Sequence, residues 1–150
     1  MTEWDIVARL GCAVLAGLLL GLDREIRGIQ AGLRTHALVA LSAAAITISA
    51  LLLHDALDAD GRTRTDPLRV IQGLAQAIGF ISAGVIFVAR EKVLNVTSAV
   101  NVWLAAAMGI AAGAGQYFLL LVSTGFGLII LVAIRFVERI LPQRDEQGKH

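Results

Sequence analysis

The sequence has little of three residue types that shape soluble domains. It holds one cysteine and two prolines in 150 residues, and only 17% of its residues are charged. A single cysteine excludes an internal disulfide framework, and Cys12 lies in an apolar run, where we expect it to pack as a small apolar residue. A soluble domain carries about 25% charged residues, so this chain has too little charge to cover a surface that faces water.

Apolar residues are abundant instead. They make up 57% of the chain, and the mean hydropathy is +0.74. The formal net charge of +1 gives no electrostatic basis for binding nucleic acid, and no nucleic-acid partner is expected. These values predict a protein integral to a lipid bilayer.

Five apolar runs are long enough to cross a bilayer, which takes about 17–25 residues. The last of them can extend to residue 141. The sequence therefore predicts an all-α fold, a polytopic membrane helical bundle of about five transmembrane helices over residues 1–142. A short cytoplasmic polar tail is expected at residues 143–150. The predicted spans are residues 4–22, 35–53, 68–89, 96–112 and 117–134.

The basic residues predict how the bundle is oriented, because cytoplasmic loops carry an excess of Lys and Arg. Five crossings place nine basic residues at one face: Arg24, Arg27, Arg34, Arg90, Lys92, Arg135, Arg139, Arg144 and Lys149. The other face receives four: Arg9, Arg62, Arg64 and Arg69. We therefore expect the N-terminus outside and the C-terminus in the cytoplasm.

Small residues recur at four-residue steps in three of the predicted helices. Membrane helices associate where small residues let their backbones approach closely. The sequence thus predicts three packing seams: Ala13, Gly17 and Gly21; Ala75, Gly79 and Ala83; Ala105, Gly109 and Gly113.

Three amide side chains fall inside the predicted spans. Gln72 and Gln76 share a helix face with Gly79, and Asn101 lies on the fourth helix. An unpartnered amide in hydrocarbon is costly, so we expect these amides to face protein or a water-filled cavity. They either tie the third and fourth helices together, join two subunits of a homo-oligomer, with a dimer favoured, or line a polar pathway.

Charged residues crowd the connection between the first two runs. Asp23, Arg24, Glu25 and Arg27 alternate in sign directly after the first run, and Thr35 is a plausible N-cap for the next helix. Two interpretations compete: anchoring at lipid headgroups, and a fixed ion-pair site. Asp23 and Glu25 are weak candidates for a cation or proton site. The full candidate site is Asp23, Arg24, Glu25, Arg27, Arg34, Thr35 and His36.

Enzyme motifs are lacking in the sequence. It has no His-Glu-x-x-His helix, no paired cysteines and no Gly-x-Ser-x-Gly elbow. We therefore expect a non-enzymatic protein without a cofactor, and only a divalent cation is kept as a candidate ligand.

Three segments together resemble the MgtC/SapB family of bacterial inner-membrane proteins. They are GLDREIRGIQAGLRTHALVAL, IGFISAGVIF and VLNVTSAVNVWLAAAMGIAAGAGQY. The resemblance runs from about residue 17 to residue 117. Residues characteristic of the family fall here on Asp23, Arg24, Glu25, Gly32, Arg34, Thr35, His36, Gly79, Gly84, Thr97 and Trp103. The sequence departs from the family pattern at Ser82, Asn95, Val96 and Asn101.

The resemblance implies a function in the bacterial plasma membrane. The family is associated with adaptation to low magnesium, and some members regulate other membrane proteins such as the proton-translocating ATP synthase. The first hypothesis is thus a non-enzymatic regulator that binds membrane proteins. The alternative is a small dimeric transporter or channel for Mg²⁺ or another cation. Some members carry a C-terminal cytoplasmic domain, which is not expected here.

Overall fold

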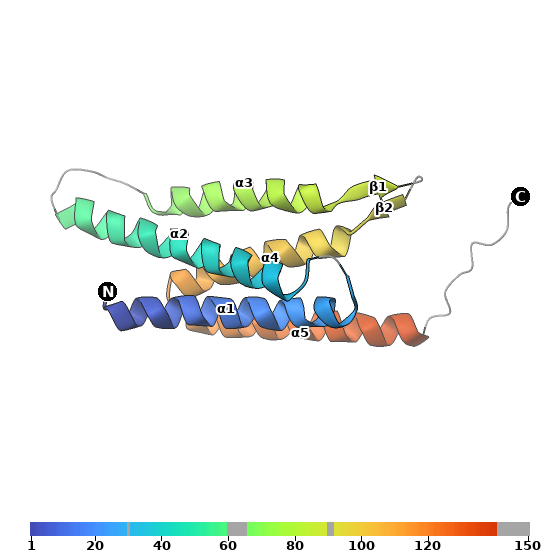
Figure 1. Ribbon diagram of the computed structural model, residues 1–150. Coiled ribbons are helices and arrows are strands. Elements are labelled where there is room, and N and C mark those ends of the chain that lie inside the picture. Colours follow the sequence, from blue (N-terminus) through green and yellow to red (C-terminus); the bar gives the residue numbers. More distant parts are fainter. Residues whose placement is uncertain (30, 60–65, 90–91, 141–150) are drawn as a thin grey trace, which may run out of the picture.

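The computed structural model describes residues 1–29, 31–59, 66–89 and 92–140. The predicted polar tail therefore lies outside the described residues. Five helices form an elongated bundle, as predicted (Figure 1). The elements are α1 (Glu3–Ile26), α2 (Leu33–Ala59), α3 (Leu68–Val85), β1 (Phe87–Ala89), β2 (Lys92–Leu94), α4 (Val96–Gly113) and α5 (Tyr117–Ile140).

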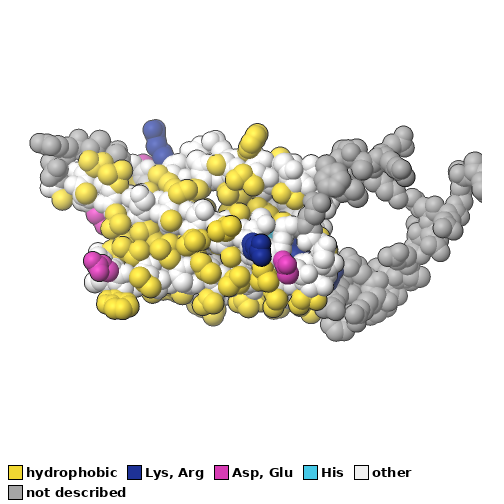
Figure 2. All heavy atoms as spheres, viewed as in Figure 1, with side chains coloured by type: hydrophobic (Ala, Val, Ile, Leu, Met, Phe, Trp, Pro, Cys, Tyr) yellow, Lys and Arg dark blue, Asp and Glu magenta, His cyan; other side chains and the backbone are white. Residues whose placement is uncertain are grey.

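Four of these helices, α1 to α4, are long and apolar enough to cross a membrane. In α5 the apolar helix found among the described residues is shorter than these four, Tyr117–Ala133. Hydrophobic side chains cover much of the surface shown in Figure 2, and few charged side chains interrupt them. The start of α1 and the end of α5 lie at opposite ends of the bundle (Figure 1). The fold is that of a multi-pass membrane protein.

The third helix ends earlier than the prediction of 68–89. It stops at Val85, and Ile86 takes an extended backbone with φ −82° and ψ 129°. Residues Phe87–Ala89 pair with Lys92–Leu94 as a short antiparallel hairpin. The segment from Val85 to Val88 is rich in β-branched and aromatic residues, which favour strands over helices.

The tightest packing joins α2 to α1 on one side and to α4 on the other. A Cβ atom built on Gly17 would lie 2.6 Å from the carbonyl oxygen of His36. One built on Gly113 would lie 2.6 Å from the carbonyl oxygen of Ala44. Cβ atoms built on Gly21 and Gly109 would also overlap the α2 backbone, at Leu33 and Ala40 respectively. The predicted seams on the first and fourth helices are confirmed, and the core between them consists mostly of alanines and Leu20.

Two helices flank this three-helix core. On α3, Leu74 and Ile78 are buried, and Ile78 packs with Ala43 of α2 and Ala106 of α4. On α5, the hydroxyl of Thr124 donates to the carbonyl of Leu120 at 2.7 Å. The seam predicted on the third helix has no counterpart in the described part of the chain, where nothing lies within 4 Å of a Cβ built on Gly79.

The turn between α4 and α5 is short and well bonded. Gly115 takes a left-handed backbone with φ +73°, which glycine adopts without strain. Arg9 of α1 donates from Nη1 to the carbonyl of Gly113 at 2.7 Å. A cation at a helix C-terminus satisfies an open carbonyl and opposes the helix dipole. This contact ties the start of α1 to the end of α4.

Replacing Gly109 by alanine tests the backbone contact. The added methyl group would overlap the backbone of Ala40, which cannot rotate away. We expect Gly109→Ala to lower the free energy of unfolding by about 1–3 kcal/mol. Gly73→Ala on α3 is the matched control, because no described atom lies within 4 Å of its Cβ position. This substitution should raise the free energy of unfolding by about 0.5–1 kcal/mol, because alanine has the higher helix propensity. Unfolding of the purified protein in detergent measures both, and equal effects would contradict the packing.

Candidate functional site

The charged stretch forms the bend between α1 and α2. The bend lies at the end of the bundle where α4 begins (Figure 1). The N–H of Gly28 donates to the carbonyl of Glu25 at 3.1 Å, and that of Ile29 donates to the carbonyl of Arg24 at 3.0 Å. Gly28 has a φ of +63°, so these bonds close α1 with a Schellman motif. The backbone therefore holds the charged side chains in fixed directions.

Asp23 and Arg27 pair with each other along α1. The Nε atom of Arg27 lies 3.1 Å from Oδ2 of Asp23. Both side chains are partly exposed, and they are four residues apart on one helix. Such pairs contribute under about 1 kcal/mol, so this pair orients Arg27 more than it stabilises the fold.

Glu25 caps the second helix from the first. Its Oε2 atom accepts a hydrogen bond from the N–H of Leu33, the first residue of α2, at 3.1 Å. The expectation that Thr35 is the N-cap is wrong, because the carbonyl of Gly32 already accepts the N–H of His36 at 3.2 Å. Thr35 lies inside the first turn, half-buried. The neighbouring Arg34 is exposed.

Arg24 and His36 are buried where α1, α2 and α4 meet. Arg24 is 6% exposed and donates from Nη2 to the hydroxyl of Ser98 on α4. His36 is 0% exposed, and its Nδ1 atom lies 2.9 Å from the carbonyl oxygen of Gly32. Among the residues that the structure describes, the Nε atom of Arg24 and the Nε2 atom of His36 have no hydrogen-bond partner. The sequence did not single out Ser98 as a partner of Arg24, since the two residues are 74 positions apart.

The two acidic residues of the site do not converge. The carboxylate of Asp23 bonds Arg27, while that of Glu25 bonds the backbone of α2. Within the described part of the chain, no group of three or more His, Cys, Asp or Glu residues could hold a metal ion. Cation binding at Asp23 and Glu25 stays a prediction.

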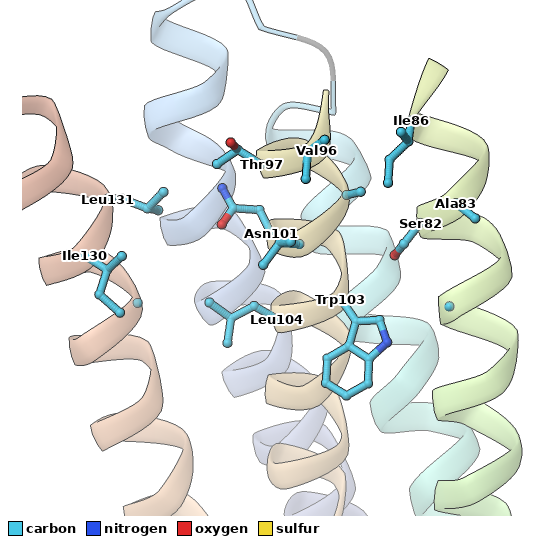
Figure 3. A pocket seen from close by; sticks show the side chains of 14 residues that line it. Ser82, Ala83, Ile86, Val96, Thr97, Asn101, Trp103, Leu104, Ile130 and Leu131 are labelled. Carbon is cyan, nitrogen blue, oxygen red and sulfur yellow. The ribbon is translucent and has the colours of Figure 1, made fainter. Parts of the chain in front are cut away.

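A lateral groove of about 770 Å³ lies between α3 and α5, with α4 as its floor (Figure 3). Figure 3 shows Asn101 and Leu104 on the side of α4 toward α5, and Trp103 toward α3. Thr97, which is exposed, also lines the groove. Most of its lining is apolar. The groove therefore opens sideways on the surface that lipid would cover.

The three predicted amides are divided between two settings. Asn101 is buried in the groove wall, where its Nδ2 atom has no hydrogen-bond partner among the described residues. Gln72 and Gln76 are exposed on α3. The expectation that these two glutamines tie the third and fourth helices together is wrong within one chain. Gly79 lines the groove, whereas Gly84 is exposed and has nothing within 4 Å of its Cβ position.

Comparison with known proteins places this arrangement in context. The model of the MgtC family matches residues 10–140. The chain is 34% identical to Protein SapB of Bacillus subtilis over 148 residues, covering 95% of this chain and 62% of the relative. It is 34% identical over 128 residues to a protein of Escherichia coli K12 named "Putative magnesium transporter YhiD", covering 85% and 59%.

A third relative gives the same picture. Protein MgtC of Brucella abortus is 34% identical over 135 residues, covering 89% of this chain and 53% of the relative. The chain thus spans less than two thirds of the length of these relatives. No solved structure matches the chain.

The two acidic residues are expected to differ in their effect on stability. Glu25→Ala removes the acceptor that caps α2 and should lower the free energy of unfolding by about 0.5–2 kcal/mol, the usual cost of losing a cap. Asp23→Asn weakens only a partly exposed pair and should cost under about 1 kcal/mol. Thermal unfolding in detergent measures both. A larger loss for Asp23→Asn than for Glu25→Ala would contradict the assigned contacts.

Proposed function

Because the chain belongs to the MgtC family of membrane proteins, we propose that it is a non-enzymatic regulator linked to magnesium limitation or ion homeostasis. It acts through helix contacts within the bacterial plasma membrane. One combination of features supports this proposal. The core between α1, α2 and α4 is closed, and the lateral groove holds buried polar atoms, on Ser82 and Asn101, that have no partner among the described residues.

The core supports regulation over conduction through one chain. Gly17 and Gly21 of α1 and Gly109 and Gly113 of α4 bring three helices into backbone contact. Alanine side chains fill the remaining space. Magnesium gives up its water reluctantly and usually keeps several water ligands, so a route for it would need a wide polar passage between these helices.

The alternative is a cation transporter, and it has one specific support. The relative from Escherichia coli bears the name of a putative magnesium transporter. With the core closed, a pathway in this protein would have to form between two copies of the chain. The two functions therefore share one requirement, which is association in the membrane.

The exposed face of α3 favours a second copy of this chain as the associating partner. Gln72, Gln76, Gly79 and Ala83 share one stripe of the helix. Gln76 lies eight residues after the start of α3, which is about 12 Å along the axis, so its carboxamide reaches well into the hydrocarbon layer. Without a partner there, the carboxamide carries a penalty of several kcal/mol.

A twofold-related copy would satisfy these amides. A carboxamide donates and accepts hydrogen bonds, so like residues pair across a twofold axis, where each subunit presents the same patch. Gly79 has nothing within 4 Å of its Cβ position, and it lines the groove together with Ala83. Two α3 helices can therefore approach closely at this point. We assign the dimer interface to this stripe.

The orientation follows from the charges. We place the N-terminus outside and the bend with Asp23 and His36 on the cytoplasmic side. The support is the excess of basic residues at that face of the sequence. The bundle also starts and ends on opposite sides (Figure 1).

The dimer interface is tested by Gln76→Leu, measured by energy transfer between labelled copies in vesicles. Interhelical hydrogen bonds in membranes contribute about 1 kcal/mol, so losing this pair should weaken self-association about fivefold. Gln116→Leu makes the same change at an exposed residue outside the helices, and it should associate like the wild type. Unchanged association of the Gln76→Leu variant would contradict the interface.

Flux measurements separate regulation from transport. Vesicles that contain the purified protein and a magnesium indicator should take up no more Mg²⁺ than empty vesicles, with an ionophore as positive control. In cells that lack their own family member, Gln76→Leu should reduce growth at limiting magnesium, while Gln116→Leu should not. Uptake by the wild type that Asp23→Asn abolishes would overturn the regulator in favour of the transporter.

A further inference from the structure

Arg24 carries a buried charge that no acidic residue in the described part of the chain neutralises by contact. A guanidinium stays ionised in proteins and offers five N–H donors. Arg24 is 6% exposed. Its Nη2 donates a hydrogen bond to the neutral hydroxyl of Ser98, and its Nε has no partner among the described residues. The adjacent carboxylates of Asp23 and Glu25 are engaged elsewhere. Buried charges in proteins are normally paired, so this one calls for an anion.

The start of α4 adds favourable electrostatics at the same place. Ser98 is the third residue of this 18-residue helix, and it is 0% exposed. The N–H groups of a first helical turn have no acceptor within the helix, and the helix dipole places partial positive charge there. The guanidinium of Arg24 therefore sits against a helix N-terminus, which is a favoured location for phosphate groups.

His36 contributes a group that suits a phosphate in particular. Its Nδ1 atom bonds the carbonyl of Gly32, so Nδ1 carries a proton and Nε2 is a lone pair in the neutral ring. Nε2 is buried and has no hydrogen-bond partner among the described residues. Inorganic phosphate that carries one proton offers anionic oxygens to the arginine and an O–H to the histidine, whereas a lipid phosphodiester offers the anionic oxygens alone. A chloride ion lacks the second feature.

We propose that Arg24, His36 and Ser98, with the first turn of α4, form a site for a phosphate group. This anion site differs from the cation site expected at Asp23 and Glu25, and it does not depend on the regulatory function proposed above. Arg24 lies two residues before the end of α1, at the end of the bundle where α2 and α4 begin (Figure 1). The phosphate comes from solution on that side or from the headgroup of an adjacent lipid.

The test is thermal unfolding of the delipidated protein in a phosphate-free maltoside detergent. Inorganic phosphate should raise the melting temperature in a saturable way, because a ligand that binds only the folded state stabilises it. Potassium chloride of equal ionic strength should not. Arg24→Gln should abolish the response, whereas Arg34→Gln should keep it, since Arg34 is an exposed arginine of the same bend.

Two further arms keep the test decisive. If Arg24→Gln does not fold, Ser98→Ala takes its place and should weaken the phosphate response at least threefold. Phosphatidylglycerol without free phosphate separates the two sources: a response to it that depends on Arg24 or Ser98 assigns the site to a lipid headgroup. The site is refuted if neither phosphate source stabilises the protein, or if both variants respond like the wild type.

Discussion

The structure depends on the contact between the backbone of α2 and glycines on both of its neighbours. Gly17 and Gly21 of α1 meet the first turn of α2, and Gly109 and Gly113 of α4 meet its middle. In a bilayer the hydrophobic effect does not drive helices together, because lipid tails are as apolar as leucine. Close backbone approach replaces it. The same contact brings the ends of α1, α2 and α4 together, so the buried position of Arg24 follows from the packing of the helices rather than from its own sequence neighbours.

This core leaves the two flanking helices less constrained. α3 and α5 reach it through single faces, and the groove between them exposes the wall of α4 that carries Asn101 (Figure 3). Ser82 lines the same groove, and its buried hydroxyl has no hydrogen-bond partner among the described residues. Among the described residues, the buried polar side-chain atoms that lack partners thus lie in the groove, at the α1–α2 bend and, for Nε of Arg9, beside the end of α4.

Hydropathy alone predicted the number of helices and where each begins to within two residues, because a bilayer forces each apolar run to close its own hydrogen bonds. It ended the first two helices too early, at residues 22 and 53, because α1 and α2 continue through polar residues to Ile26 and Ala59. The end of α3 was missed, since apolar β-branched residues at 85–88 read as helix or strand alike. The seams on α1 and α4 were predictable from residue spacing. The contact of Arg24 with Ser98 was not, because it joins helices 74 residues apart and depends on how α1 is rotated. The exposure of Gln72 and Gln76 likewise depends on which side of α3 meets α4.

The charges of the bend show why alternation in sequence does not give neutrality in space. Asp23 and Arg27 are four residues apart and share a face of α1, so they neutralise each other. Glu25 reaches across to the start of α2. Arg24 is rotated by about 100° from Asp23, which turns it toward α4 instead. A single step of one residue along α1 therefore separates a compensated pair on the outside from an uncompensated cation inside. The stretch from Asp23 to Arg27 holds two acidic and two basic residues, yet only the positive charge of Arg24 faces the interior. This buried cation therefore determines which ligands the inner side of the bend can bind.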